Sequence, residues 1–509
     1  MYFTEPDRLI SAIVNIISVF NSVSQRLKGY VISRLVLVAG CWMLVSGAIS
    51  MGQANYYSKS AGNLELLASW GTNTDGSGTL PANFITANQI FNIRNNATPT
   101  IGANWTVSGA GSKVILGDGT AACVFTIPGT FQFISSCDVS NIGTLKISSS
   151  AVTPYSGTLI VHTGGTYEHA VDGGTIPAAT WNAGSNCNIT GIINSAGPGI
   201  GLAGQTFGNF TWNCPAQTSN FYLASSFTVS GNFSVLGTGV YDHPNHSLRM
   251  SASGIGYTIT VGGDFVVGNT STFKMNSSNG SCFLNIGGNL LINSGNLTIV
   301  SGTVNSTVNV TGNVNVSGGN LNMKEHANST TGILNVKGNF IQSGGIITLL
   351  NAPPGAGAIN FNGTATQTYS KSGGTISNAV NFTVNNGSIL DMGTSVIDGS
   401  TGTFTLLSGA GIITAHFQGL STTAGTGSIQ VTGTKSFDAG ADYTYNGLVA
   451  QLTGNGVSTV HNLTIDNPTG VTLSNSISTT ALLNLNQGSV TTGGNILYLT
   501  NGTPGSLTY

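Results

Sequence analysis

Apolar and polar residues alternate along most of this chain after residue 54, in short runs separated by turns. Residues 284–299 contain three such runs, whose apolar members are Leu284 and Ile286, Leu290 and Ile292, and Leu297 and Ile299. A period of two residues is that of a β-strand with one buried face. Each run therefore predicts a short strand, and the three together predict a unit of three strands joined by turns.

The same unit recurs about every 25 residues. Five consecutive copies fill residues 226–365, and their first apolar positions are Phe227, Ile259, Leu284, Val308 and Leu334. A unit of this size is too small to bury its own apolar face, so neighbouring units must stack on one another. Immunoglobulin-like arrays would repeat at about 100 residues instead. The period therefore predicts an all-β fold, a right-handed parallel β-helix (β-solenoid) with about 24–26 residues per coil.

Stacking makes specific neighbours of residues that lie far apart in the sequence. We expect Ile286, Val310 and Val336 to lie on one line parallel to the solenoid axis, with their side chains in the core. Asn309 should then point outward, and the substitution Asn309→Asp should be nearly neutral. A Gly-Asn or Gly-Asp pair, such as Gly312-Asn313, follows the first strand of each unit. These residue types tolerate positive φ, and we expect that property to form the corner there.

The regularity divides the chain into four regions. Residues 1–54 form an export segment, 55–225 an irregular β-rich solenoid region, 226–365 the regular coils, and 366–509 further solenoid repeats. An open solenoid end exposes an unpaired strand edge, which invites aggregation. We therefore expect the natural chain to continue beyond Tyr509.

The first region has the pattern of a secretion signal. Arg26, Lys28 and Arg34 precede an apolar run over residues 35–49, and small residues at 52 and 54 suit cleavage. Two alternatives stay open, namely a lipoprotein cleavage box at residues 38–41 and an uncleaved anchor that includes the apolar residues 9–20. Any contact with a membrane is expected only through this segment.

Charge is scarce in this sequence. The 509 residues include 14 Lys and Arg and 16 Asp and Glu, so that 6% are charged, against about 25% in ordinary soluble proteins. A basic surface for nucleic acid is therefore excluded. Glycine is abundant, at 72 residues, yet 40% of the chain is hydrophobic, which argues against a disordered polymer.

Five cysteines follow the export segment: Cys123, Cys137, Cys187, Cys214 and Cys282. They contain no CxxC pair, so a zinc site is not expected. An oxidising compartment would permit Cys123–Cys137 and Cys187–Cys214 bridges. Burial as small core residues is the alternative.

Three strings of residues resemble the large repeat-rich surface proteins that Gram-negative bacteria export by type IX secretion. They are residues 462–473, 443–447 and 173–177. The resemblance extends over most of residues 55–509 and implies export and a destination outside the cell or on its outer surface. It transfers no catalytic residue. Such proteins usually end in a C-terminal sorting domain, which this sequence does not contain, so either the chain is truncated or export by this route is in doubt.

Two clusters of residues are candidates for ligand binding. The first is an insertion between Val235 and Leu248, where the other units have a much shorter turn; it carries Tyr241, Asp242, His243 and His246, with Arg249 beyond it. Insertions in solenoids often form the binding face. The two histidines with Asp242 could in principle ligate a metal, although Pro244 and the short spacing make a solvated loop the stronger interpretation.

The second cluster consists of Tyr167, Glu168 and His169, followed by Asp172 and, further on, by Trp181. Aromatic rings beside carboxylates suit a sugar-binding face. Tyr and Trp side chains can equally cover the end of a β core, with the polar edge of the ring in contact with solvent. Lys324-Glu325-His326 has the composition of a solvated turn.

These observations favour an exported cell-surface or extracellular structural or adhesive protein whose partners are glycans or other surface proteins. The main alternative is a carbohydrate-active enzyme, a polysaccharide lyase or glycosidase, on the same scaffold. Such chemistry needs carboxylates that face one groove, and the sequence shows no paired aspartates. We therefore predict no catalytic residues, no metal and no cofactor.

Overall fold

The computed structural model describes residues 52–118, 121–148, 155–194, 200–240, 246–251, 254–276, 278–350 and 355–509. The export segment up to residue 51, with both of its alternatives, lies outside the described residues. Contacts divide the chain into two compact units, Met1–Gln53 and Ala54–Tyr509. All that follows concerns the second unit.

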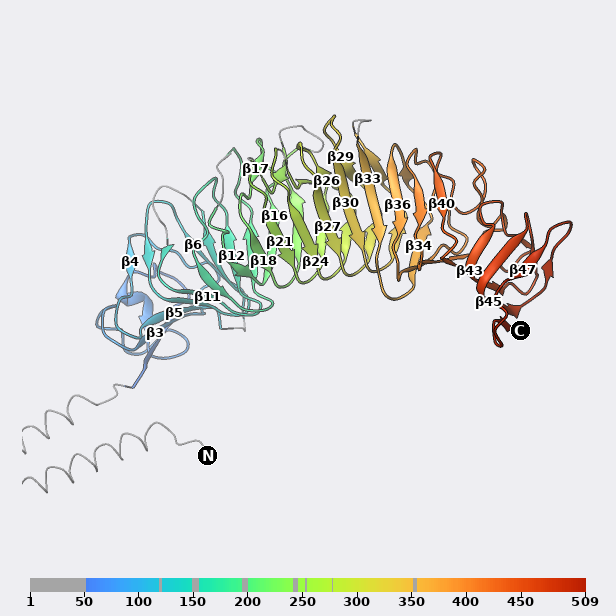
Figure 1. The fold of residues 1–509 in the computed structure, drawn as a ribbon. Helices are drawn as coiled ribbons and strands as arrows, with labels where there is room; N and C mark the ends of the chain where they lie inside the picture. Colours follow the sequence, from blue (N-terminus) through green and yellow to red (C-terminus); the bar gives the residue numbers. More distant parts are fainter. Residues whose placement is uncertain are drawn as a thin grey trace, which may run out of the picture. The chain divides into compact units, whose positions relative to one another are not determined.

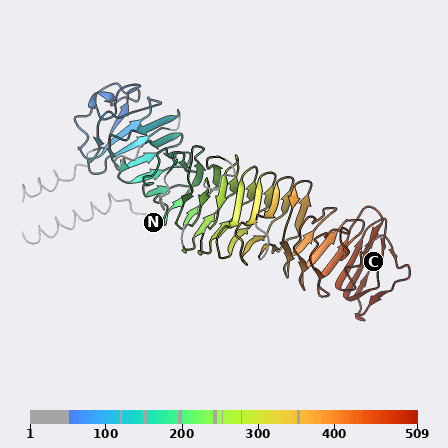
Figure 2. The same cartoon turned by 90° about the horizontal axis from the view of Figure 1, so that it is seen from above.

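This unit is a β-solenoid of about 16 turns, so the predicted fold is confirmed. Its strands pair almost entirely in parallel, each with the equivalent strand of the next coil. Figures 1 and 2 show these strands following one another along the unit in sequence order, from the N-terminal to the C-terminal coils. Among the described residues the helical element is one short 3-10 turn, η1 (Leu67–Ser69).

Two sheets belong to the N-terminal coils. The N-terminal sheet contains β1 (Ala54–Ser58), β2 (Trp70–Gly71), β3 (Gln89–Ile93), β5 (Lys113–Leu116), β8 (Cys137–Val139), β11 (Leu159–Val161) and β13 (Ala179–Trp181). A smaller sheet contains β4 (Trp105–Thr106), β7 (Phe133–Ile134) and β10 (Tyr155–Ser156). The pairing of β1 with β2 is antiparallel, unlike the parallel pairs of the coils that follow.

One sheet, here called the long sheet, continues from coil to coil down to the C-terminal end. Its strands are β6 (Cys123–Ile127), β9 (Gly143–Ile147), β12 (Thr166–His169), β14 (Asn186–Ile189), β16 (Asn209–Asn213), β19 (Phe233–Gly237), β22 (Phe265–Val267), β25 (Leu290–Ile292), β28 (Val314–Val316), β31 (Phe340–Gln342), β34 (Gln367–Lys371), β37 (Ile389–Asp391), β39 (Gly411–Thr414), β41 (Asp442–Tyr445), β43 (Thr459–Asp466), β45 (Ile477–Gln487), β47 (Leu497–Leu499) and β48 (Leu507–Thr508).

Two further sheets complete the middle coils. The ten-stranded sheet contains β15 (Thr206–Phe207), β18 (Phe227–Val229), β21 (Thr258–Val261), β24 (Phe283–Ile286), β27 (Ser306–Val310), β30 (Thr331–Val336), β33 (Ala356–Phe361), β36 (Val380–Val384), β38 (Phe404–Leu406) and β40 (Lys435–Phe437). The third sheet contains β17 (Phe221–Tyr222), β20 (Leu248–Arg249), β23 (Thr272–Lys274), β26 (Asn296–Val300), β29 (Asn320–Lys324), β32 (Ile346–Leu349) and β35 (Thr375–Ile376). The C-terminal coils add β42 (Gln451–Leu452), β44 (Val471–Thr472) and β46 (Val490–Thr491).

Each middle coil gives one strand to each of these three sheets, as the three apolar runs predict. The expected line of core residues is present, because Ile286 pairs with Val310 and Val310 pairs with Val336 in the parallel register. All three side chains are buried. The 24- and 26-residue steps between them match the predicted coil length.

The coil length changes in other parts of the unit, both outside the middle coils and at their first coil. Tyr167 pairs with Cys187, 20 residues on, and Leu463 pairs with Leu483 at the same spacing. Insertions lengthen other coils, so that Phe233 pairs with Phe265, 32 residues on. The structural repeat therefore continues through the whole unit, although its sequence period varies.

The corners at the Gly-Asn pairs form for a different reason from the one predicted. None of the glycines Gly231, Gly263, Gly288, Gly312 and Gly338 has a positive φ. A Cβ on Gly312 would instead collide with the carbonyl oxygen of Gly288 in the coil before it. The glycines are needed because neighbouring coils approach too closely for any side chain.

The side chain of the residue after each of these glycines forms a hydrogen bond to the next coil. Asn289 Oδ1 accepts a hydrogen bond from the Asn313 backbone N–H at 2.9 Å, and Asn313 Oδ1 accepts one from Asn339 at 2.8 Å. Asp264 takes the same position and accepts from Asn289 at 2.7 Å. An aspartate at this corner is thus an acceptor in a structural ladder, and it serves the same purpose as its asparagine neighbours.

Candidate binding surfaces

The aromatic members of the second predicted cluster lie in the core. Tyr167 and His169 alternate with Glu168 on β12, and both point inward. The Tyr167 ring meets the Trp181 ring edge to face, with centroids 6.0 Å apart. Trp181 is 8% exposed and its Nε1 donates to Gln205 Oε1 at 2.8 Å. These rings form no exposed platform for a sugar, and the alternative of a capped β core describes their environment.

His169 is held within this core by hydrogen bonds at both ring nitrogens. Its Nδ1 lies 3.2 Å from Tyr167 Oη, and its Nε2 lies 2.7 Å from the Gly173 carbonyl oxygen. Burial lowers the pKa of His169, because the charged imidazolium is poorly solvated there. A neutral ring that donates to Gly173 fits this geometry.

Glu168 is the member of this cluster that reaches the outer face. It accepts hydrogen bonds from Lys146 Nζ at 2.9 Å and from Thr190 Oγ1 at 3.0 Å. These partners lie on the coils before and after it, so the carboxylate joins three coils. That arrangement is structural, because both hydrogen bonds of the Glu168 carboxylate are made to neighbouring coils.

The insertion between β19 and β20 is only partly described. Tyr241, Asp242 and His243 lie outside the described residues. His246 is buried, and its Nδ1 accepts a hydrogen bond from the Val240 backbone N–H at 3.1 Å. Arg249 lies over the ring of Tyr222, 5.8 Å from its centroid. The structure therefore brings Arg249 next to an aromatic ring and buries His246.

Arg249 belongs to a cluster of charged side chains on the third sheet that the sequence did not reveal. Arg249 and Lys274 are register partners on adjacent strands, an arrangement that like charges disfavour. Lys274 Nζ reaches both carboxylate oxygens of Glu325 at 2.7 Å. Burial raises the pKa of the Glu325 carboxyl, but Lys274, Ser301 and Arg249 outweigh it, so the net shift is downward.

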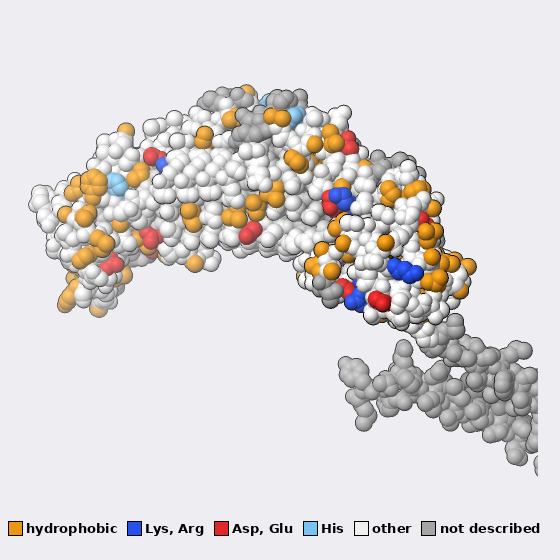
Figure 3. Space-filling view, turned by 180° about the vertical axis from the view of Figure 1, so that it is seen from behind, with side chains coloured by type: hydrophobic (Ala, Val, Ile, Leu, Met, Phe, Trp, Pro, Cys, Tyr) orange, Lys and Arg blue, Asp and Glu red, His pale blue; other side chains and the backbone are white. Residues whose placement is uncertain are grey.

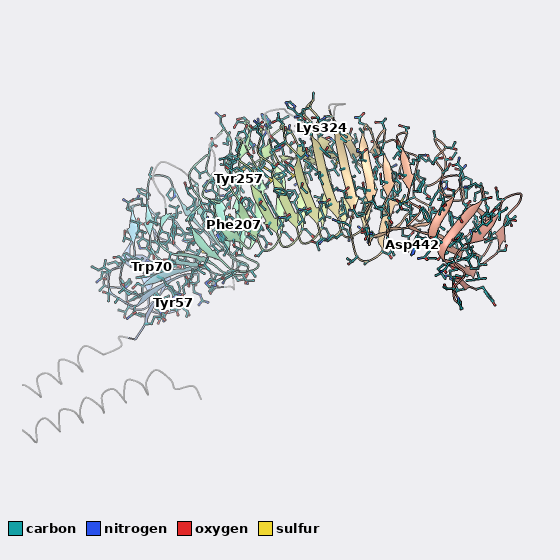
Figure 4. All side chains as sticks on the ribbon, in the orientation of Figure 1. Tyr57, Trp70, Phe207, Tyr257, Lys324 and Asp442 are labelled. Atoms are coloured by element: carbon teal, nitrogen blue, oxygen red, sulfur yellow. The ribbon has the colours of Figure 1, made fainter. Side chains whose placement is uncertain are left out.

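Lys324 corrects the prediction of a solvated turn at residues 324–326. Its side chain is buried, and Nζ donates to the Asn328 carbonyl oxygen at 2.6 Å. Figure 4 labels this residue beside the middle coils. Sequence alone gave no signal for its burial, since Lys324 ends strand β29 and its contact depends on how the following turn folds back.

The outer face of the ten-stranded sheet carries one continuous line of uncharged polar side chains. We call these ten register partners the polar row: Thr206, Thr228, Thr260, Asn285, Asn309, Asn335, Asn360, Thr383, Thr405 and Ser436. Every member is partly or fully exposed. The row takes one residue from each strand of the sheet, and no charged or apolar side chain interrupts it.

Four members of the polar row are asparagines that bond to one another, and we call them the amide ladder: Asn285, Asn309, Asn335 and Asn360. Asn309 Nδ2 donates to Asn285 Oδ1 at 2.8 Å, and Asn335 Nδ2 donates to Asn309 Oδ1 at 2.8 Å. Asn360 continues the ladder to Asn335 at 2.9 Å. All the amides therefore point the same way along the axis, which fixes their orientation.

An apolar residue lies next to the ladder on the same face. Phe283 precedes Asn285 by two residues on β24, so both side chains point outward. Phe283 is 43% exposed. The face thus combines oriented amides, hydroxyl groups and one accessible aromatic ring.

The described cysteines form no disulfide. All five are free and buried, so the alternative of small core residues describes them in this structure. Burial raises the pKa of the Cys123 thiol to about 12, with a smaller contribution from Asp118. Thiols of this kind are poor nucleophiles at neutral pH.

The described part of the chain contains neither a cluster of metal-ligating side chains nor a long apolar helix. There, no three His, Cys, Asp or Glu side chains gather closely enough to hold a metal ion. Among the same residues, no helix has the length and apolar character needed to span a bilayer.

The fold defines the class of this protein as a β-solenoid, and comparison with known proteins adds no narrower assignment. No family model, curated protein or solved structure matches the chain. Its function must be argued from its own surfaces.

Proposed function

We propose that this chain is an exported structural or adhesive protein, secreted or held on the outer surface of a Gram-negative cell, and that it binds glycans through the polar row. The single observation that carries the proposal is the row itself, a line of ten partly or fully exposed hydroxyl and amide side chains without a charge. Export is supported by the leader-like sequence pattern and by the resemblance to secreted repeat proteins.

The chemistry of the row suits a neutral, hydroxyl-rich polymer. Hydroxyls and amides both donate and accept hydrogen bonds, as sugar hydroxyls do. Phe283 supplies an apolar surface of the kind that sugar rings stack against. The stacked strands keep the row rigid, so little conformational entropy is lost when a ligand binds.

A matched pair of charge substitutions tests this surface. Thr228 lies in the polar row on β18, and Ser234 lies on the outer face of the long sheet in the same coil. We expect Thr228→Glu to weaken sedimentation of the full chain with insoluble cell-wall polysaccharides, because a carboxylate would have to be desolvated against the polymer. Ser234→Glu should leave sedimentation unchanged. Equal effects of the two changes, or no binding to any polysaccharide, would contradict the proposal.

Location requires a separate measurement. Antibody against the solenoid should label intact cells, or detect the chain in the culture medium. Signal only after lysis would show that the chain is not exported. Release of reducing ends from the bound polysaccharide would instead support the enzyme alternative.

A further inference from the structure

We propose that the amide ladder recognises the crystalline surface of a polysaccharide of N-acetylated amino sugars, a ligand in which acetamido groups are themselves stacked by hydrogen bonds. This inference rests on the proposed function of the polar row and narrows its ligand to one chemical class.

The ladder leaves half of its hydrogen-bonding capacity available. A side-chain amide has two N–H donors and an oxygen with two lone pairs. Asn309 and Asn335 each use one donor and one lone pair within the ladder. One N–H and one lone pair per amide therefore remain for a ligand on the outer side, in an orientation that is the same at each coil.

The spacing of these groups is set by amide stacking. Equivalent residues on adjacent parallel strands lie about 4.8 Å apart, and columns of hydrogen-bonded side-chain amides adopt the same repeat. Acetamido groups that stack through N–H···O=C bonds in a crystalline polysaccharide obey the same geometry. Donors and acceptors on the two surfaces can therefore stay in register over all four amides, Asn285 to Asn360.

The neighbouring side chains fit the rest of such a surface. Threonines precede and follow the ladder in the polar row, and their hydroxyl groups suit the ring hydroxyls of the sugar. Phe283 and the partly exposed Ile333 lie beside the ladder on the same face. Their apolar surfaces suit the acetyl methyl groups.

A polymer without acetamido groups would lose this match. Cellulose presents hydroxyl groups alone, and deacetylated chitin presents ammonium groups, which would be desolvated against amides without a counter-charge. A soluble oligomer contains no column of stacked acetamides. The inference therefore predicts a preference for the crystalline acetylated polymer over all three.

The test is co-sedimentation of the full chain with crystalline chitin, chitosan and cellulose, together with competition by soluble N-acetylglucosamine oligomers. We expect binding to chitin that is about tenfold or more tighter than to chitosan or cellulose. Soluble oligomers should compete weakly. Similar binding to all three solids would overturn the inference.

A conservative double substitution isolates the amides. Asn309→Thr with Asn335→Thr replaces two ladder amides by a residue that the same row carries at Thr260 and Thr383, so the fold should persist. We expect this variant to lose chitin binding about tenfold. The control Asn315→Thr lies in the coil of Asn309 but on the long sheet, and it should bind as the unsubstituted chain does.

The outcomes separate this inference from the proposed function. Binding to a different polysaccharide that Thr228→Glu weakens, without a preference for chitin, would overturn the amide-ladder inference and support the broader proposal. Unchanged chitin binding by the double variant would also overturn the inference. Absence of binding to any polysaccharide would overturn both.

Discussion

The middle coils and the N-terminal coils stack in the same parallel register by different chemistry. In the middle coils one core line runs Leu284, Val308, Leu334 and Ile359, all aliphatic, while the outer face repeats asparagine. The equivalent line in the N-terminal sheet runs Val114, Cys137, Leu159 and Ala179, with sizes that change at each step. Repetition of the fold thus does not require repetition of the residue.

The N-terminal coils fill their core with aromatic rings instead. Trp105 stacks on Phe133 with centroids 5.0 Å apart, and Phe133 contacts Tyr155 at 5.6 Å. Ion pairs join adjacent N-terminal coils, as between Lys113 and Asp138 at 2.5 Å, whereas amides join the middle coils along the ten-stranded sheet. Figure 3 shows charged side chains gathered toward these coils, and mostly uncharged surface over the middle. The size and type of the core residues vary from coil to coil here, which hides the period from the sequence.

The largest effect should follow from placing a charge in the regular core. Val310 is 2% exposed, between Ile286 and Val336. Val310→Asp should destabilise the unit by about 4 kcal/mol or more, because the carboxylate has no partner there. The shift in the denaturant midpoint measures this, with Val310→Ile as the control for shape. A loss below about 1 kcal/mol would mean that the side chain can reach water.

A glycine at a coil corner should come next. A methyl group at Gly312 would collide with backbone of the preceding coil, whereas Gly254 has open space around it and no positive φ. We expect Gly312→Ala to cost about 1–3 kcal/mol, as other overpacked sites do, and Gly254→Ala to be neutral. Hydrogen exchange should show the loss in the coils around Gly312, since coils of a solenoid open locally. Equal effects of the two substitutions would show that the close approach of neighbouring coils does not explain the glycine at this corner.

The amide ladder changes the expectation for Asn309. An aspartate there would oppose its oxygen to Asn285 Oδ1, where the amide now donates. Asn309→Asp should therefore cost about 1–2 kcal/mol and not be neutral as the sequence suggested. Asn309→Thr, which matches other members of the polar row, should cost less. The difference between the two midpoints is the measurement, and equal midpoints would show that the ladder adds no stability.

The sequence could predict the strands, the solenoid and the facing of Val310, since each depends on alternation that repeats. It could not predict that Tyr167 and Trp181 face the core. The coils around them do not repeat regularly in sequence, so the pattern does not show which of the alternating positions point inward. In the sequence, the residues of the amide ladder can be recognised only as asparagines at polar positions of the repeated strands. Its function as a ladder requires Asn285 and Asn309 to share a register, which depends on coil length and therefore on the folded structure.

Acid should destabilise the N-terminal coils through His169. Burial lowers its pKa from the ordinary value of 6.5, so the unfolded chain binds the proton more tightly than the folded one. The stability that the neutral ring contributes is complete above pH 6.5 and is lost as pH falls below it. Thermal midpoints between pH 8 and 5 should show this decline, and His169→Gln should flatten it. His416, whose pKa burial also lowers, contributes in the same direction, so its substitution by Gln is the comparison.

The smallest effect should come from an ion pair of the N-terminal coils, set against the amides of the middle coils. Lys146 and Glu168 lie 2.9 Å apart with side chains 32% and 21% exposed. Such pairs contribute about 0.2–1 kcal/mol, and salt screens them. Lys146→Met keeps the aliphatic stem, and it should cost less than about 1 kcal/mol at low salt and still less in molar salt. The cost of Asn309→Thr should be the same at both salt concentrations, because no net charge is involved. If the two costs respond to salt alike, the distinction between charge-joined and amide-joined coils is wrong.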